Sequence, residues 1–70
     1  MKRDDKKEMI EFFLKNQVKV HVDLLDGTFL NGIIVSQIEE NIYLLDEVKL
    51  GKIYLFVNQI KNIEQYRRVE

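Results

Sequence analysis

The first hydrophobic residues of the chain recur at intervals of three and four positions. This pattern predicts an amphipathic helix over about residues 4–15 that ends at Asn16. Asp5 and Glu8 have the spacing of a capping box at its start. The side chains expected to cover a neighbouring apolar surface are Met9, Phe12 and Phe13. The side chains expected to point largely toward solvent are Lys6, Lys7, Glu11 and Lys15.

A period of two replaces the helical pattern from Gln17 onward. Apolar residues alternate with polar ones up to Leu24, which predicts a half-buried strand. Asp26 and Gly27 then lie between two apolar runs. Because both residues tolerate the positive φ angles of tight hairpin turns, they predict a short hairpin into a second strand.

The rest of the chain consists of short apolar runs separated by turn residues. We expect strands at about 29–38, 42–46 and 52–57, and a last short strand that contains Ile60 and Ile63. Gly32 lies inside the second strand, where it predicts a bulge or sharp bend that lets a small barrel close. The predicted fold class is mainly β: an N-terminal α-helix followed by a strongly bent five-stranded antiparallel sheet, or open barrel. Residues 1–70 are expected to form a single domain, with the sheet over about 17–64 and a short basic tail at 65–70.

The run from Ile53 to Val57 carries no charged side chain. The last strands of a small open barrel tend to lie at its edge, and exposed edges are normally protected by Lys or Pro. An unprotected apolar edge indicates pairing with another chain, and head-to-tail pairing of identical subunits can close into a ring. The alternative is that this run forms a central strand.

Length and composition limit what can stabilise the chain. A chain of 70 residues builds only a small core, which disulfides, a metal or self-association often supplement. The absence of Cys excludes disulfides, and one His leaves too few ligands for a structural zinc site. We therefore expect oligomerisation, and no metal or cofactor.

No group of residues points to catalysis. His21 has no Ser, Cys or carboxylate pair arranged with it, and adjacent carboxylates such as Glu39 and Glu40 are usually solvated in a turn. We therefore predict that the protein is not an enzyme. The sequence also shows no signal peptide and no apolar run long enough to span a membrane, which predicts a cytoplasmic location.

Charge is distributed unevenly, although the net charge is only −1. The segment from Val20 to Val48 contains six acidic residues and no Lys or Arg, while all eleven basic residues lie outside it. This segregation permits one basic face on a nearly neutral protein. A basic face is the electrostatic feature that nucleic-acid binding requires.

Three segments together resemble the Sm and Sm-like superfamily, and most closely its Hfq branch. Residues 20–32, VHVDLLDGTFLNG, combine an alternating strand with a polar-Gly turn and a second Gly five residues later. Residues 42–46, IYLLD, are similar to the apolar run that ends the first family motif. Residues 56–60, FVNQI, stand in the place of the short second motif of Hfq. The resemblance covers about residues 9–63.

The resemblance implies a homo-hexameric ring that binds single-stranded, U-rich RNA and acts as an RNA chaperone for small RNAs. In Hfq-like proteins the ring face that carries the helix binds this RNA through the helix start and two turns. The matching residues here are Lys6, Lys7, Glu40, Asn41, Val57, Asn58 and Gln59. The residues predicted for the subunit interface are Ile53, Tyr54, Leu55, Phe56 and Ile60.

Departures from the Hfq pattern change these expectations. Asn41 stands where Hfq usually has an aromatic residue, and Val57 and Asn58 stand where it has Lys-His. The Asn amides can still hydrogen-bond a base edge, but stacking and phosphate contacts should be weaker. Asp23 replaces an aromatic residue on the opposite ring face, so A-rich RNA is not expected to bind there.

Two alternatives remain open at the level of the sequence. The first is a heptameric, archaeal-type Sm ring that serves RNA processing. The second is a monomeric SH3-like barrel that binds protein segments by strand addition along the edge at residues 53–57.

Overall fold

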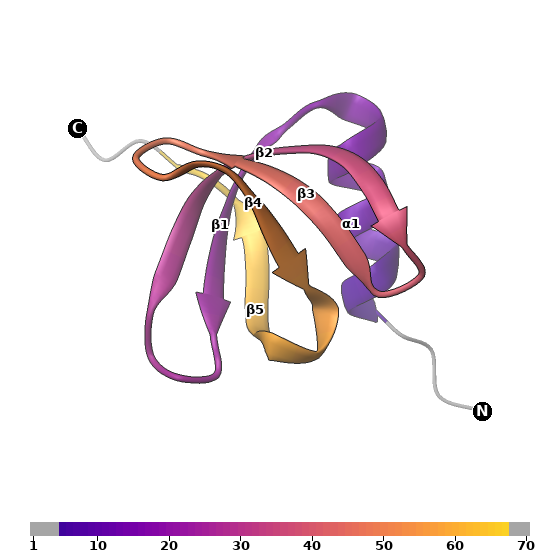
Figure 1. Cartoon of the computed structure of the whole chain (residues 1–70). Helices are drawn as coiled ribbons and strands as arrows, with labels where there is room; N and C mark the ends of the chain where they lie inside the picture. Colours follow the sequence, from indigo (N-terminus) through magenta and orange to yellow (C-terminus); the bar gives the residue numbers. More distant parts are fainter. Residues whose placement is uncertain (1–4, 68–70) are drawn as a thin grey trace.

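The computed structural model describes residues 5–67 (Figure 1). Over these residues it contains one α-helix, five β-strands and one 3-10 turn, η1, which confirms the predicted fold class. The elements are α1 (Asp5–Asn16), β1 (Lys19–Leu24), β2 (Phe29–Glu39), β3 (Ile42–Glu47), β4 (Gly51–Phe56), η1 (Val57–Gln59) and β5 (Ile60–Gln65). The predicted helix residue 4, the capping side chain of Asp5 and the tail residues 68–70 lie outside the described part of the chain.

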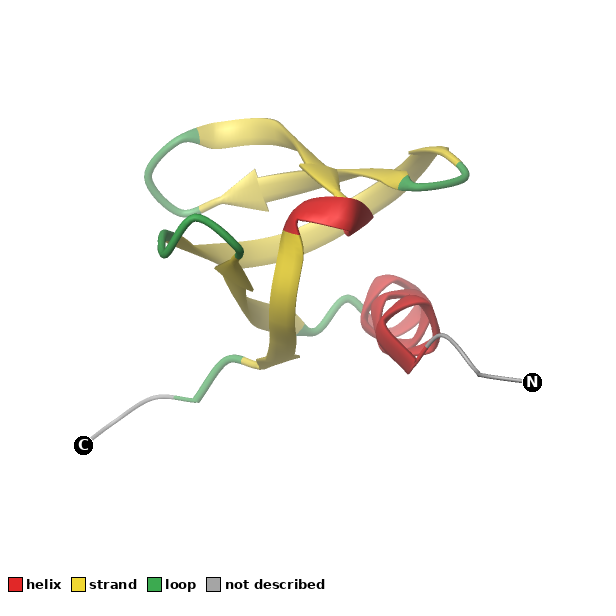
Figure 2. Ribbon diagram, turned by 90° about the horizontal axis from the view of Figure 1, so that it is seen from below, coloured by secondary structure: helices red, strands yellow, loops and turns green. Residues whose placement is uncertain are grey.

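The five strands form one antiparallel sheet in the order β4-β3-β2-β1-β5. β4 and β5 are therefore the two edges of the sheet. The predicted edge position of the apolar run at residues 53–57 is confirmed, and a central position is excluded. The sheet is strongly bent, and α1 lies to one side of it in contact with β2 and β5 (Figure 2).

The pairing of β2 with β3 contains two irregularities. The register shifts between Ile34 and Ser36 and again between Gln37 and Glu39. Neither shift lies at Gly32, where the sequence predicted a bulge or bend. A Cβ atom at Gly32 would overlap the backbone of Asp46, whose carbonyl carbon would lie only 2.8 Å away. Gly32 is thus required by the close approach of β2 to β3, and the bulges follow it.

The hydrophobic core lies between α1 and the inner face of the sheet. Its members are Ile10, Phe13, Val20, Val22, Ile34, Tyr43, Leu45, Leu55, Val57, Ile60 and Ile63. Full burial of such a side chain is worth roughly 1.5–3 kcal/mol, so this cluster is the main source of stability.

The face that α1 buries differs from the prediction at two positions. Phe13 is 6% exposed, as predicted, but Met9 is 39% exposed and Phe12 59% exposed. Ile10 takes the central place instead and is fully buried. Ile10 and Phe13 lie three residues apart and share one stripe of the helix, whereas Met9 and Phe12 lie beside that stripe.

The β1–β2 turn is a hairpin in which only one of the two predicted residues has a positive φ. Gly27 has a φ of 93°, and Asp26 does not enter this region. The Asp26 carboxylate instead accepts hydrogen bonds from the Thr28 hydroxyl at 2.7 Å and the Thr28 N–H at 3.0 Å. These two bonds lower the pKa of Asp26.

The β3–β4 turn is organised by one buried carboxylate. The Glu47 side chain is 7% exposed. Its oxygens accept hydrogen bonds from the backbone N–H groups of Asn31 at 3.1 Å, Lys49 at 2.7 Å and Leu50 at 2.9 Å. These N–H groups, that of Asn31 first, hold the pKa of Glu47 below its ordinary value. The turn is thereby tied to β2 as well as to the strands that it joins.

Candidate nucleic-acid interface

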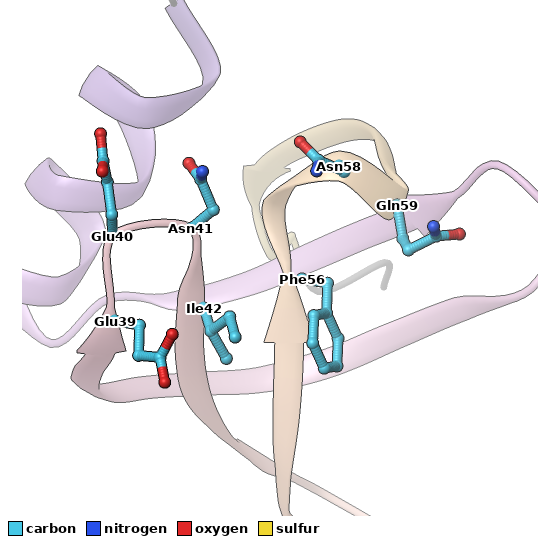
Figure 3. A pocket seen from close by; sticks show the side chains of 7 residues that line it. All are labelled: Glu39, Glu40, Asn41, Ile42, Phe56, Asn58 and Gln59. Atoms are coloured by element: carbon cyan, nitrogen blue, oxygen red, sulfur yellow. The ribbon is translucent and has the colours of Figure 1, made fainter.

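A pocket of about 470 Å³ opens where the β2–β3 turn meets η1 (Figure 3). Its lining residues are Glu39, Glu40, Asn41, Ile42, Phe56, Asn58 and Gln59. Ile42 and Phe56 are cross-strand partners in β3 and β4. A cavity of this volume is large enough for a small organic ligand.

Hydrogen bonds join the two turns that form the pocket. The N–H of Val57 donates to the carbonyl oxygen of Asn41 at 3.0 Å, which connects η1 to the β2–β3 turn. The side-chain amide of Gln37 donates to the carbonyl oxygens of Glu39 at 3.1 Å and Glu40 at 3.2 Å. The backbone around the pocket is therefore held from both sides.

The pocket combines apolar surface with amide groups. Phe56 is 45% exposed and Ile42 is half-buried, so both present apolar surface to it. The amides of Asn41 and Asn58 lie above the β2–β3 turn and η1, the side chains of Ile42 and Phe56 point to the opposite side, and Gln59 extends outward from η1 (Figure 3). Since an amide can donate and accept at the same time, this arrangement suits a flat ring with polar edges.

Two lysines of α1 reach segments next to the pocket, one the β2–β3 turn and the other the start of β5. The Nζ of Lys7 lies 3.9 Å from a carboxylate oxygen of Glu40, and the Nζ of Lys6 donates to the Ile60 carbonyl oxygen at 2.9 Å. Both lysines are half-buried, so the prediction that they largely face solvent is wrong. Long lysine side chains can lie along apolar surface and still place their charge at its border. An exposed ion pair such as Lys7–Glu40 is worth only roughly 0–1 kcal/mol.

The structure brings together four of the residues predicted from the resemblance to bind RNA. Those that line the pocket are Glu40, Asn41, Asn58 and Gln59. Val57 offers no side chain to the pocket, because it is 4% exposed and packs in the core. Its contribution is the backbone bond to Asn41.

Three lining residues were not predicted for this site: Glu39, Ile42 and Phe56. Glu39 adjoins a predicted residue, so proximity in the chain was a usable signal. Ile42 and Phe56 meet only because of the register between β3 and β4, which the motifs do not specify. Phe56 was predicted for the subunit interface instead.

The predicted interface residues divide into exposed and buried side chains. Tyr54 and Phe56 are 61% and 45% exposed, and their rings lie 6.4 Å apart in an edge-to-face arrangement. Ile53 is half-buried. Leu55 and Ile60 are 2% and 0% exposed, so they can offer only backbone groups to another chain while the core stays intact.

His21 lies on β1 between two side-chain oxygen atoms. Its Nδ1 is 2.6 Å from Asn31 Oδ1, and its Nε2 is 3.1 Å from Asp23 Oδ1. Both partners are acceptors, so the protonated imidazolium, which donates from both nitrogens, fits this site best. Hydrogen bonding to Asn31, followed by the bond and charge of Asp23, raises the pKa of His21 despite its partial burial.

Neither a metal-binding cluster nor a membrane-spanning helix occurs in the described part of the chain. Residues 5–67 contain no group of three or more His, Cys, Asp or Glu side chains that could hold a metal ion. Within the same range, no helix has both the length and the hydrophobicity of a membrane span.

Comparisons with known proteins bear on the fold. Models of protein families gave no match, and neither did the curated proteins. Among solved structures, the chain is similar to a crystal structure described as that of the pleiotropic translational regulator Hfq. The two chains share 20% sequence identity and superpose with a TM-score of 0.70 over 86% of this chain and 97% of the other. The chain therefore has the Sm-like fold of Hfq, as the resemblance in sequence predicted.

Proposed function

We propose that this protein assembles into a ring and binds single-stranded RNA in the pocket between the β2–β3 turn and η1, without performing chemistry. The observation that carries this proposal is one pocket whose lining combines the apolar side chains of Ile42 and Phe56 with the amides of Asn41 and Asn58. The likeness in fold to Hfq supports it.

Each part of the pocket suits one part of an RNA strand. Single-stranded RNA exposes base faces, which stack on aromatic side chains for roughly 1–3 kcal/mol per base. Phe56 offers such a face, and Asn41 and Asn58 offer hydrogen bonds to base edges. Lys6 and Lys7 supply positive charge near the pocket. When such charges neutralise phosphates, the RNA releases its counterions, which favours binding.

The two edges of the sheet support assembly into a ring. β4 of one subunit can pair with β5 of the next, and repetition of this head-to-tail contact leaves no free edge. We propose a hexamer, as the resemblance implies, with a heptamer as the alternative. Native mass spectrometry distinguishes six copies from seven, and a monomer would contradict the ring.

We extend this proposal to a role as an RNA chaperone in post-transcriptional regulation in the cytoplasm. In Hfq-like proteins the corresponding ring face binds U-rich RNA, and the resemblance taken alone would assign the same ligand to this pocket. The chaperone role predicts faster annealing of two complementary RNAs in the presence of the protein. An unchanged annealing rate would contradict that role. The base preference depends on the side chains of the pocket, which differ from the Hfq pattern.

Titration of fluorescently labelled oligo-U and oligo-A, followed by anisotropy at two salt concentrations, tests RNA binding directly. Tight binding that weakens with salt supports the proposal, because phosphate contacts release counterions. Binding of neither oligonucleotide contradicts it. Asn58→Ala should weaken binding about tenfold, as expected for the loss of one good hydrogen bond, without changing the mass of the ring.

The exposed β4 edge also favours a second function, namely binding of an extended protein segment by strand addition. A protein with that function would be monomeric and indifferent to RNA. The mass in solution and the oligonucleotide titration therefore separate the two proposals.

A further inference from the structure

Carboxylates, rather than cations, stand beside the amides of the pocket. Glu39 and Glu40 both line it, and none of the described Lys or Arg residues does. We infer that the pocket selects adenine or cytosine over uracil, because these bases carry an exocyclic amino group beside an unprotonated ring nitrogen. The inference rests on the proposed function, since it concerns the base bound at that same site.

The two carboxylates are available as acceptors. The Gln37 amide bonds the backbone carbonyls of Glu39 and Glu40 and so closes the turn without using their side chains. Among residues 5–67, the Glu39 carboxylate has no hydrogen-bond or ion-pair partner. The Glu40 carboxylate lies 3.9 Å from Lys7 Nζ, which is beyond hydrogen-bond distance.

Base edges differ in what they present to a carboxylate. Uracil presents one N–H between two carbonyl oxygens, and these oxygens repel a negatively charged acceptor. Adenine and cytosine present an amino donor next to a ring nitrogen that accepts a hydrogen bond. A Glu carboxylate can accept from the amino group while an Asn amide donates to the ring nitrogen. The lining of the pocket therefore matches an amino-bearing base better than uracil.

The carboxylate of Glu40 and the amides of Asn41 and Asn58 are the groups placed to make these contacts on a single base. Figure 3 shows the side chains of Glu40, Asn41 and Asn58 directed to one side of the two turns, whereas those of Glu39, Ile42 and Phe56 are directed to the other. Glu39 and Glu40 come from the end of β2 and the turn after it, on the Asn41 side of the pocket. Their negative charge also repels phosphate, so the group favoured inside the pocket is the base.

The test compares labelled oligo-A, oligo-C and oligo-U of equal length on the full chain, by anisotropy at one salt concentration. We expect oligo-A or oligo-C to bind roughly 5- to 150-fold more tightly than oligo-U, the range that one good base-edge contact provides. Glu39→Gln and Glu40→Gln should reduce this ratio. Glu11→Gln removes the same charge from an exposed position on α1 outside the pocket, and it serves as the matched control.

The outcomes separate the base preference from RNA binding itself. Equal affinities, or tighter binding of oligo-U, overturn the preference for adenine or cytosine but remain consistent with RNA binding at this pocket. If Glu39→Gln and Glu40→Gln both leave the base preference unchanged, the preference does not arise in this pocket. The same conclusion follows if Glu11→Gln reduces the preference as much as they do. Failure to bind any of the three oligonucleotides overturns the proposed function as well. The comparison on the unaltered chain needs no variant, so a variant that fails to fold does not prevent the test.

Discussion

Two turns of the sheet carry glutamates in contrasting surroundings. In the β3–β4 turn, Glu47 is buried and accepts three backbone N–H groups, so its charge is used to hold the fold. In the β2–β3 turn, Glu39 and Glu40 are exposed, and the amide of Gln37 holds the backbone instead. The same side-chain chemistry is structural in one turn and available to a ligand in the other. Burial and the number of N–H groups that face the carboxylate make the difference.

Gly32→Ala should have the largest effect, because it would separate β2 from β3 beside the Glu47 turn. The added Cβ would overlap the backbone of Asp46, which cannot move as a flexible side chain could. We expect a loss of about 3 kcal/mol or more in the free energy of unfolding, measured by urea denaturation. Gly27→Ala is the control, since it meets open space at a φ of 93° and should cost only about 1–2 kcal/mol. Equal losses would contradict the close approach at Gly32.

Glu47→Gln should destabilise the protein less than Gly32→Ala but more than Glu39→Gln. The pKa of Glu47 is lowered in the folded state, so its stabilisation is fully present above the ordinary pKa of 4.5. This stabilisation is lost as the pH falls through the lower folded value. The stability difference between wild type and Glu47→Gln should therefore shrink in acid.

Glu39→Gln is the matched control for this comparison, because it makes the same chemical change in the other turn. An exposed substitution of this kind should change the free energy of unfolding by no more than about 0.5 kcal/mol, at neutral or acid pH. Urea denaturation of both variants over a pH series measures the contrast. If Glu47→Gln and Glu39→Gln lost similar amounts of unfolding free energy, Glu47 would not be more important to the fold than Glu39.

Phe56→Ala should weaken RNA binding by about 1–3 kcal/mol, through the loss of one stacking surface in the pocket. Anisotropy with the preferred oligonucleotide measures this loss. Tyr54→Ala removes the neighbouring exposed ring of β4 outside the pocket and should leave the affinity of the assembled ring unchanged. If both variants lose binding and assembly together, Phe56 acts through the subunit interface rather than the pocket.

The smallest expected effect on stability comes from His21. Asn31 contacts both this side chain and Glu47 of the β3–β4 turn. Asn31 donates its N–H to Glu47, while its side-chain oxygen lies against His21. Asn31→Ala keeps the backbone bond to Glu47 and removes the side-chain contact with His21. The pKa of His21 should therefore fall toward its ordinary value of 6.5. The raised pKa stabilises the fold below that value, and this stabilisation is lost as the pH rises through the folded pKa. An NMR titration of the imidazole checks the shift, and an unchanged pKa would show that Asn31 is not its main cause.

The elements of the fold follow from local patterns, so the sequence predicted them closely. The helix was expected over about residues 4–15 and runs from Asp5 to Asn16. The uncharged run at 53–57 correctly placed β4 at an edge of the sheet. Periodicity depends on neighbours in the chain, and no tertiary contact is needed to recognise it.

The candidate site could be predicted only in part. The resemblance indicated Asn41 and Asn58 in two separate turns, and the structure places both at one pocket. It did not indicate Phe56, because the Ile42–Phe56 pair depends on the strand register. Nor did it show that Val57 points into the core.

By itself, the sequence determined the order of helix and strands, the uncharged edge and the separation of acidic from basic segments. Only the tertiary structure decided which helix stripe is buried, why residue 32 must be glycine, and which glutamates are structural. Those properties depend on what lies opposite each residue across the sheet or against the helix, such as the backbone of Asp46 opposite Gly32. Segments distant in the chain create these surroundings, so local pattern does not contain them.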